Sequence, residues 1–184
     1  MLSSGAIALA AAGASPRLRD LGGQWLEPFT PKGPASVLLF VSSDCPISNS
    51  YAPEIQRLCH QFQSQGVGCS LFYEDLQLDA AAARKHFDEY GFGGIPAAID
   101  GERTVAKAAG ATVTPQAVVV DRQGAVRYRG RIDNFYAALG KPRQRVTVHD
   151  LRDALDAVVS RRPVSTPDTH AFGCSIVPAD VMRK

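Results

Sequence analysis

The chain has 184 residues, which is enough for one domain with a complete hydrophobic core. Hydrophobic residues make up 45% and charged residues 21%, an ordinary globular balance, and no stretch is long enough to span a bilayer. A formal net charge of +2 is too small to indicate a nucleic-acid partner. The densest basic cluster before the tail is formed by Arg127, Arg129 and Arg131. Alternate residues share one face of a strand, so a solvated face is the better interpretation of this cluster.

The cysteine content excludes two classes of small protein. Four cysteines are too few for a disulfide scaffold in a chain of this length. None of them forms a close CxxC pair, which excludes a zinc ribbon. For the function favoured below we expect neither a metal nor a cofactor.

The chain begins with a segment unlike the rest. Residues 7–12 are small and apolar, and the run continues into Ala-Gly-Ala-Ser at residues 12–15. This resembles the end of a secretory signal, although no Lys or Arg precedes the run. This pattern favours an extracytoplasmic location, periplasmic or secreted, with the cytoplasm as the alternative. The predicted division is a leader or signal-like segment at residues 1–20, a domain at 21–160, and a Pro-rich tail at 161–184 that contains Cys174.

The first half of the domain reads as alternating strands and helices. A continuous apolar run at residues 36–41 predicts a strand buried on both faces, followed by a turn at 42–46. Residues 47–65 follow a helical pattern that Gly66 ends. A second strand is predicted at 67–73 and a second helix at 80–90.

The second half predicts a hairpin and a final helix. A short strand at 95–99 and a short helix at 104–109 precede strands at 116–120 and 125–129, which pair around a turn. Residues 131–140 are expected to form a loop, which lies beside the face that carries Cys45, a residue discussed below. Residues 147–160 are predicted to form the last helix, with Thr147 and Asp150 as an approximate capping box. This order predicts an α/β fold with a central mixed sheet and helices on both faces.

Cys45 is the residue that points to chemistry. It lies between a buried strand and a helix, where free N–H groups and a partial positive charge favour a thiolate, so we expect it to be nucleophilic. Pro46 suits an early helical position because its missing N–H is not needed there. The alternative is a buried structural cysteine, and the polar turn before Cys45 argues against it.

The residues around Cys45 carry a family resemblance. The stretch Phe-Val-Ser-Ser-Asp-Cys-Pro-Ile-Ser, residues 40–48, resembles the active-site turn of thioredoxin-like proteins. Pro53 stands where thioredoxins have a kinking proline, and Thr114-Pro115 resembles their cis-proline loop. The resemblance covers about residues 36–160 and is greatest to bacterial redoxin-domain proteins of the AhpC/TSA type, with Asp-Cys-Pro-Ile-Ser-Asn and a late Gly-Cys pair. It implies a thioredoxin-like fold and a thiol-disulfide oxidoreductase with Cys45 as its catalytic nucleophile.

The proline loop has a physical purpose in this interpretation. A cis bond before Pro115 turns the backbone of Thr114 toward the Cys45 sulfur, where it can pair with an extended substrate. We therefore predict that Thr114 and Pro115 bind substrate. An ordinary trans proline that opens a strand is the alternative.

A second cysteine is missing from the usual place. Ser48 stands where a dithiol thioredoxin has its resolving cysteine; we count it, with Ser42 and Pro46, as a supporting residue. Cys59 lies about 20 Å further along the same predicted helix. Cys69 falls within a strand and is predicted to be a small core residue. Cys174 remains as the second predicted catalytic residue, with a free tail thiol as the alternative.

Two other functions stay open. Peroxiredoxins resemble this fold and carry Pro-x-x-x-Thr/Ser-x-x-Cys; Ser42 fills the hydroxyl position, but Leu38 stands where the proline should be. A copper(I) module would use His170 with Cys174 and Cys45, although copper-delivery proteins of this fold usually carry a close cysteine pair. The predicted partners are protein or small-molecule thiols and disulfides, and the sequence does not indicate the oligomeric state.

Overall fold

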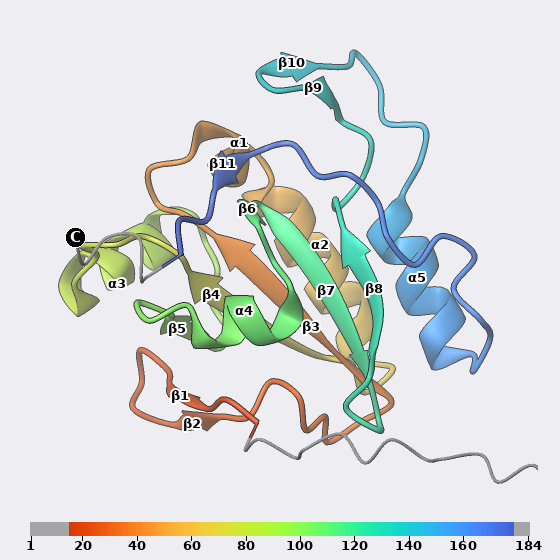
Figure 1. Ribbon diagram of the computed structural model, residues 1–184, viewed down its shortest axis with the longest axis horizontal. Coiled ribbons are helices and arrows are strands. Elements are labelled where there is room, and N and C mark those ends of the chain that lie inside the picture. Colours follow the sequence, from red (N-terminus) through yellow and green to blue (C-terminus); the bar gives the residue numbers. More distant parts are fainter. Residues whose placement is uncertain (1–14, 179–184) are drawn as a thin grey trace, which may run out of the picture.

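A five-stranded mixed sheet forms the centre of the protein in a computed structural model that describes residues 15–178 (Figure 1). The strand order is β5-β4-β3-β7-β8, with β3, β4 and β5 parallel and β7 antiparallel to both of its neighbours. The strands are β3 (Ala35–Val41), β4 (Gly68–Tyr73), β5 (Ala97–Ile99), β7 (Gln116–Asp121) and β8 (Val126–Gly130). This is a thioredoxin-like α/β fold, so the predicted fold class is confirmed.

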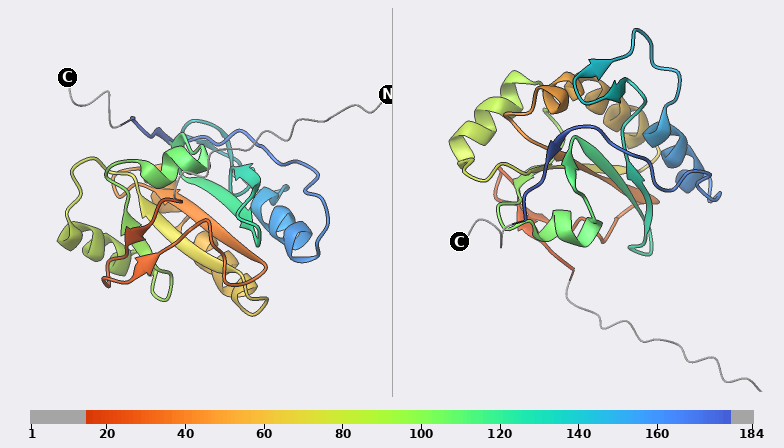
Figure 2. Two further views of the ribbon diagram at one scale, coloured as in Figure 1. Left: turned by 60° about the horizontal axis from the view of Figure 1, so that its bottom comes forward. Right: turned by 45° about the horizontal axis from the view of Figure 1, so that its top comes forward.

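Helices cover both faces of the sheet (Figures 1 and 2). Successive residues of a strand point to opposite faces, so Leu39 of β3 packs with the helices of one face and Leu38 with the helix of the other. The first face carries α2 (Ala52–Gln63), α3 (Ala80–Glu89) and α5 (Asp150–Val159), and the second carries α4 (Thr104–Ala109). The continuous apolar run of β3 therefore belongs to a strand buried on both sides, as predicted.

The helix predicted at residues 47–65 is two helices. A short helix, α1 (Pro46–Ser50), ends at Tyr51, and α2 starts directly after it. Pro53 lies in the first turn of α2, where a residue without an N–H costs no hydrogen bond. The break reorients the chain between the turn that holds Cys45 and the helix that packs on the sheet.

The capping box predicted for the last helix is wrong. The helix α5 starts at Asp150, and its N-cap residue, His149, makes no side-chain cap hydrogen bond. Thr147 bonds instead to Asn134, whose Oδ1 accepts from the Thr147 amide at 2.9 Å and whose Nδ2 donates to its hydroxyl at 2.8 Å. These bonds tie the loop before α5 to the segment after β8.

Small two-stranded ribbons surround the sheet. Within the predicted loop at 131–140, β9 (Tyr136–Ala138) pairs with β10 (Lys141–Pro142) in a hairpin. Another ribbon, β1 (Leu18–Arg19) with β2 (Trp25–Leu26), lies beside β5 through a bridge from Asp20 to Ala98. The predicted leader falls largely on residues 1–14, outside the described residues, and its boundary at residue 20 stays a prediction.

The C-terminal tail is extended and crosses the end of the sheet (Figures 1 and 2). After α5 it runs along β8, where the Arg129 amide donates to the Pro167 carbonyl at 2.9 Å. It then reaches β6 (Val113–Thr114), where β11 (Cys174–Ser175) pairs with it in antiparallel orientation. The tail thus connects the edge strand β8 with the short strand β6.

The arginine cluster is used for internal ion pairs. Each of the three side chains has an aspartate partner: Arg127 pairs with Asp121, Arg129 with Asp168 and Arg131 with Asp150. Each of these charges is therefore paired with a carboxylate of the same chain. Among the helices of residues 15–178, none is long and apolar enough to cross a membrane.

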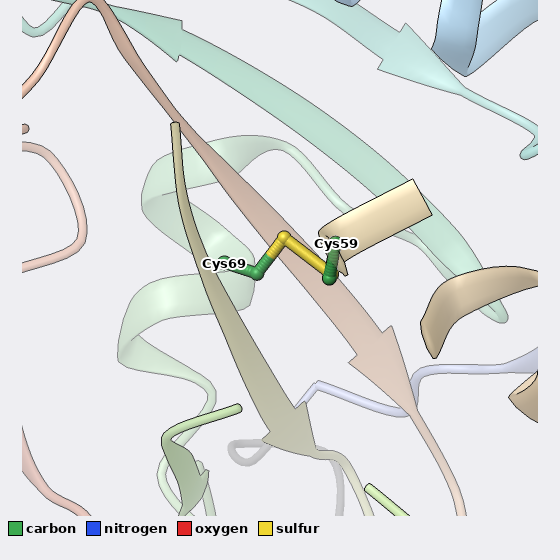
Figure 3. Close-up of a disulfide and its surroundings, with 2 residues drawn as sticks. All are labelled: Cys59 and Cys69. Carbon is green, nitrogen blue, oxygen red and sulfur yellow. A yellow bond between two sulfur atoms is a disulfide. The ribbon is translucent and has the colours of Figure 1, made fainter. Parts of the chain in front are cut away.

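One disulfide was not predicted from the sequence. Cys59, near the end of α2, is bonded to Cys69 in β4 across a Cα–Cα distance of 5.9 Å (Figure 3). The prediction that Cys69 is only a small core residue is wrong. The turn after α2 brings the chain back at once into β4, so two residues that are 10 positions apart lie opposite each other.

Candidate active site

Cys45 is held at the start of α1, directly after the turn that follows β3. It is the N-cap residue, with an extended backbone, and its sulfur accepts a hydrogen bond from the Ser48 amide at 3.5 Å. Pro46 occupies the first helical turn, as the sequence predicted. The side chain of Cys45 is 0% exposed, so the sulfur does not face solvent.

The proline loop lies against this sulfur. The bond between Thr114 and Pro115 is cis, and the Thr114 carbonyl oxygen is 3.3 Å from the Cys45 sulfur. The alternative of a trans proline is therefore wrong. The backbone of Thr114 faces Cys45 as expected, yet its strand edge is already occupied, because β11 of the same chain pairs there.

Cys174 lies directly opposite Thr114 in that ribbon. Its sulfur is 2.6 Å from the Cys45 sulfur, although the two residues are 129 positions apart. Its sulfur is partly buried against Cys45, and this burial, followed by the effect of Cys45 itself, raises the pKa of the Cys174 thiol to about 11, although most of the residue faces solvent. Unlike Cys45, Cys174 is exposed.

A glycine permits the close approach of the tail. A β-carbon on Gly173 would lie 2.0 Å from the Thr114 carbonyl oxygen, far inside van der Waals contact. Any other residue at this position would push the tail off the proline loop. The Gly-Cys pair singled out in the sequence therefore has a steric reason for its first member.

The supporting serines position the turn rather than the sulfur. The Ser48 hydroxyl accepts from the Ser42 amide at 3.2 Å, and the Ser42 hydroxyl donates to Asp75 at 2.7 Å. Asp75 also accepts from the Ser43 amide, at 3.0 and 3.1 Å from its two oxygens. A peroxidase needs a hydroxyl that can activate the peroxide, and the Ser42 hydroxyl is committed to Asp75.

A second set of polar side chains, on α1 and α3, holds the turn that precedes Cys45. Asn49 donates to the Ser43 carbonyl at 2.8 Å, and its Oδ1 is 2.9 Å from His86 Nε2. Since an amide oxygen only accepts, His86 carries its proton on Nε2, and Nδ1 accepts from the Tyr73 hydroxyl at 2.9 Å. Burial lowers the pKa of His86, which favours this neutral form. Sequence reasoning did not find Asp75, His86 or Tyr73; only Asn49 belongs to a motif that it quoted.

An aromatic wall borders the other side of the site. The Tyr51 hydroxyl donates to Asp133 at 2.8 Å, and the Tyr136 hydroxyl lies 3.1 Å from that of Ser50. Burial raises the pKa of Asp133. Together with Pro115 and the tail residue Phe172, these side chains surround a small hollow. The segment after β8 therefore contacts the end of α1 and borders this hollow together with Pro115; that it serves the Cys45 face stays a prediction.

The predicted copper ligands are not assembled into a site. His170 is exposed and packs edge-on against Phe172, with a ring-centroid distance of 4.6 Å. Within residues 15–178 one group of three potential metal ligands exists, with donor atoms within 4.8 Å of one another: Glu54, Asp133 and His149. It contains neither cysteine of the site, and Arg57 already pairs with Glu54 at 2.6 Å.

Comparison with known proteins agrees with this geometry. Residues 14–129 match the profile of the AhpC/TSA family. A hypothetical protein from Sinorhizobium meliloti is 26% identical, with a TM-score of 0.76 over 94% of this chain and 95% of the other. An uncharacterized conserved protein from Geobacillus kaustophilus is also 26% identical, with a TM-score of 0.73 over 88% of each chain.

A more distant structure shares the fold. A secreted disulfide oxidoreductase from Mycobacterium tuberculosis is 16% identical, with a TM-score of 0.55 over 80% of this chain and 96% of the other. No curated protein sequence matches the chain.

Proposed function

Because the chain belongs to the AhpC/TSA family of thioredoxin-like redoxins, we propose that it is a thiol-disulfide oxidoreductase in which Cys45 and Cys174 form the redox pair. The observation that carries the proposal is the distance of 2.6 Å between their sulfurs. A small approach closes a disulfide bond of about 2.05 Å. Two thiols then become one disulfide, and two electrons and two protons pass to the substrate disulfide, which becomes two thiols.

The two cysteines have different roles in this cycle. Cys45 attacks one sulfur of the substrate disulfide; the other sulfur leaves as a thiolate, and a mixed disulfide remains on Cys45. The Ser48 amide supports the attacking thiolate. Cys174 then attacks the Cys45 sulfur and releases the second substrate thiol. Thr114 and Pro115 present the backbone along which the substrate lies, and Ser42 and Pro46 help to hold the turn.

The second disulfide supports an oxidising location for this activity. Structural disulfides persist in secreted and periplasmic proteins and are rare where thiols are kept reduced. Cys59 and Cys69 are bonded inside the domain, away from the redox pair. We therefore propose that the protein works outside the cytoplasm, in the periplasm or as a secreted protein.

The test is a disulfide map combined with an exchange assay. Protein oxidised with a mild oxidant is digested without reductant, and the expected cross-linked peptides contain Cys45 with Cys174 and Cys59 with Cys69. The fully reduced pair is then mixed with a peptide disulfide, and the released thiol is measured. Absence of the Cys45–Cys174 cross-link would overturn the proposal. The variant with Cys59 and Cys69 both changed to Ala serves as the control, since it keeps the redox pair.

A further inference from the structure

The two sulfurs of the proposed redox pair differ in their access to solvent. Cys45 is 0% exposed, because the turn, the proline loop and the tail strand β11 enclose it. Cys174 is exposed on that strand. Since the sulfurs are already 2.6 Å apart, closing the bond changes little of this enclosure.

The surroundings of Cys45 also oppose an incoming thiolate. The Thr114 carbonyl oxygen lies 3.3 Å from the Cys45 sulfur and occupies one side of it. Gly173 packs on the same carbonyl group so tightly that a β-carbon would overlap it. A thiolate that approached Cys45 would therefore be obstructed sterically by the proline loop and the tail.

Attack at Cys174 leaves the negative charge on the Cys45 sulfur. When a thiolate attacks a disulfide, it bonds to one sulfur and expels the other, and the sulfur that carries negative charge more easily leaves faster. Cys45 accepts the Ser48 amide hydrogen bond at the start of α1, which supports that charge. Attack at Cys45 would instead expel Cys174, whose pKa is raised to about 11 by burial and by the neighbouring Cys45, so its thiolate forms less readily than that of an ordinary cysteine.

We infer that external thiols reduce the Cys45–Cys174 disulfide by attacking the sulfur of Cys174 rather than that of Cys45. This inference rests on the proposed function. The incoming thiolate bonds to the Cys174 sulfur, the bond between the two protein sulfurs breaks, and Cys45 leaves as a thiolate. A second thiol attacks the sulfur of the first, freeing Cys174, which takes up a proton. The two reducing thiols end as one disulfide, and the protein gains two electrons.

The assignment gives the two half-reactions different entry points. Electrons enter at the exposed sulfur with the tail in place. They leave from Cys45, which reaches a substrate disulfide only when β11 moves off the proline loop. The donor therefore needs no groove of its own, and a small thiol or a flexible cysteine of a partner protein suffices.

The experiment identifies which cysteine receives the incoming thiol. Oxidised protein is mixed with glutathione, quenched with acid at short times, alkylated with N-ethylmaleimide, digested and analysed by mass spectrometry. We expect glutathione on Cys174 and the alkyl group on Cys45, with at least about a tenfold excess over the reverse pattern. An equal or larger share of glutathione on Cys45 would overturn the inference while leaving the proposed function intact. Failure to form the Cys45–Cys174 disulfide at all would overturn both.

A glycine pair provides the matched variants. Gly173→Ala is expected to push the tail from Thr114, expose Cys45 and raise the share of glutathione on Cys45 several-fold. Gly93→Ala is the control, because a β-carbon at this exposed position meets nothing within 4 Å. An unchanged glutathione distribution in Gly173→Ala would contradict the claim that the tail shields Cys45.

Discussion

The two cysteine pairs differ in role: one disulfide stabilises the fold, and the other pair is proposed to carry out thiol-disulfide exchange. Cys59 and Cys69 are 10 positions apart and join a helix to the strand that follows it, both parts of the packed core. Cys45 and Cys174 are 129 positions apart and join a rigid turn to a strand of two residues on an extended tail. Reactivity is expected where one partner can move and one sulfur meets solvent, and only the second pair satisfies both conditions.

The largest expected effect is on activity. Cys45→Ser or Cys174→Ser is expected to lower the rate of disulfide exchange at least about 100-fold, because each removes one sulfur of the redox pair. The double change of Cys59 and Cys69 to Ala leaves that pair intact and is expected to keep the rate within a few-fold. The rate of thiol release from a peptide disulfide measures both. A large loss in the Cys59 and Cys69 variant would erase the distinction between the pairs.

The next effect is on stability. In the chain-entropy description, closing a loop of 129 residues stabilises by about 5 kcal/mol and closing one of 10 by about 3 kcal/mol. We therefore expect the oxidised protein to lose more free energy of unfolding when the Cys45–Cys174 bond is reduced than when the Cys59–Cys69 bond is absent. Urea unfolding of the oxidised, selectively reduced and Cys59, Cys69 variant proteins gives the comparison. The reverse order would mean that the Cys45–Cys174 bond strains the native protein or has to order a tail that moves without it.

A smaller effect concerns pH. Because the pKa of Cys174 is raised to about 11, its thiol stays protonated well above the range in which an ordinary thiol ionises. In reduced protein we expect the alkylation rate of Cys174 to keep rising about tenfold per pH unit from pH 7 to 10, whereas a free cysteine levels off above about 8.5. Mass-resolved alkylation by iodoacetamide measures this profile. A plateau near 8.5 would mean that neither burial nor the neighbouring Cys45 raises the pKa of Cys174.

The smallest effect is expected with peroxide. The Ser42 hydroxyl donates to Asp75, and Leu38 stands where the peroxidase motif has its proline, so neither of these two positions supplies a group that activates the O–O bond. Reduced protein is therefore expected to react with hydrogen peroxide at the rate of a free cysteine. Stopped-flow measurements decide this, and a far larger rate constant would favour a thiol peroxidase.

Local sequence patterns predicted the elements better than they predicted contacts across the sheet. The apolar runs and the short helix at 104–109 match the structure closely, because each depends on neighbouring residues. The Cys59–Cys69 bond was missed because the length of one helix was considered and its return into β4 was not. Asp75 and His86 were missed because only the parallel order of β3 and β4 brings their segments to the Cys45 turn.

The position of the C-terminal tail could not be predicted from local sequence patterns. Its residues have no helical or strand periodicity. The sequence therefore indicated that the tail is long enough to reach Cys45, but not where it packs on the domain. The proximity of Cys174 to Cys45 was a prediction from elimination, and the structure brings the two sulfurs together. The burial of Cys45 beneath the tail was not expected, since a nucleophile in a polar turn suggested an accessible sulfur.

The contact between the tail and β8 also bears on aggregation. β8 is an edge strand of the sheet, and an uncovered edge offers free N–H and C=O groups to a strand of another molecule. The Arg129 amide donates to Pro167, and the Arg129 carbonyl accepts from the Thr169 amide at 3.0 Å, so the tail occupies these groups. Movement confined to the chain beyond Thr169 can free Cys45 while the edge stays covered. A cycle that detached the whole tail would expose the edge at every turnover and invite molecules to pair edge to edge.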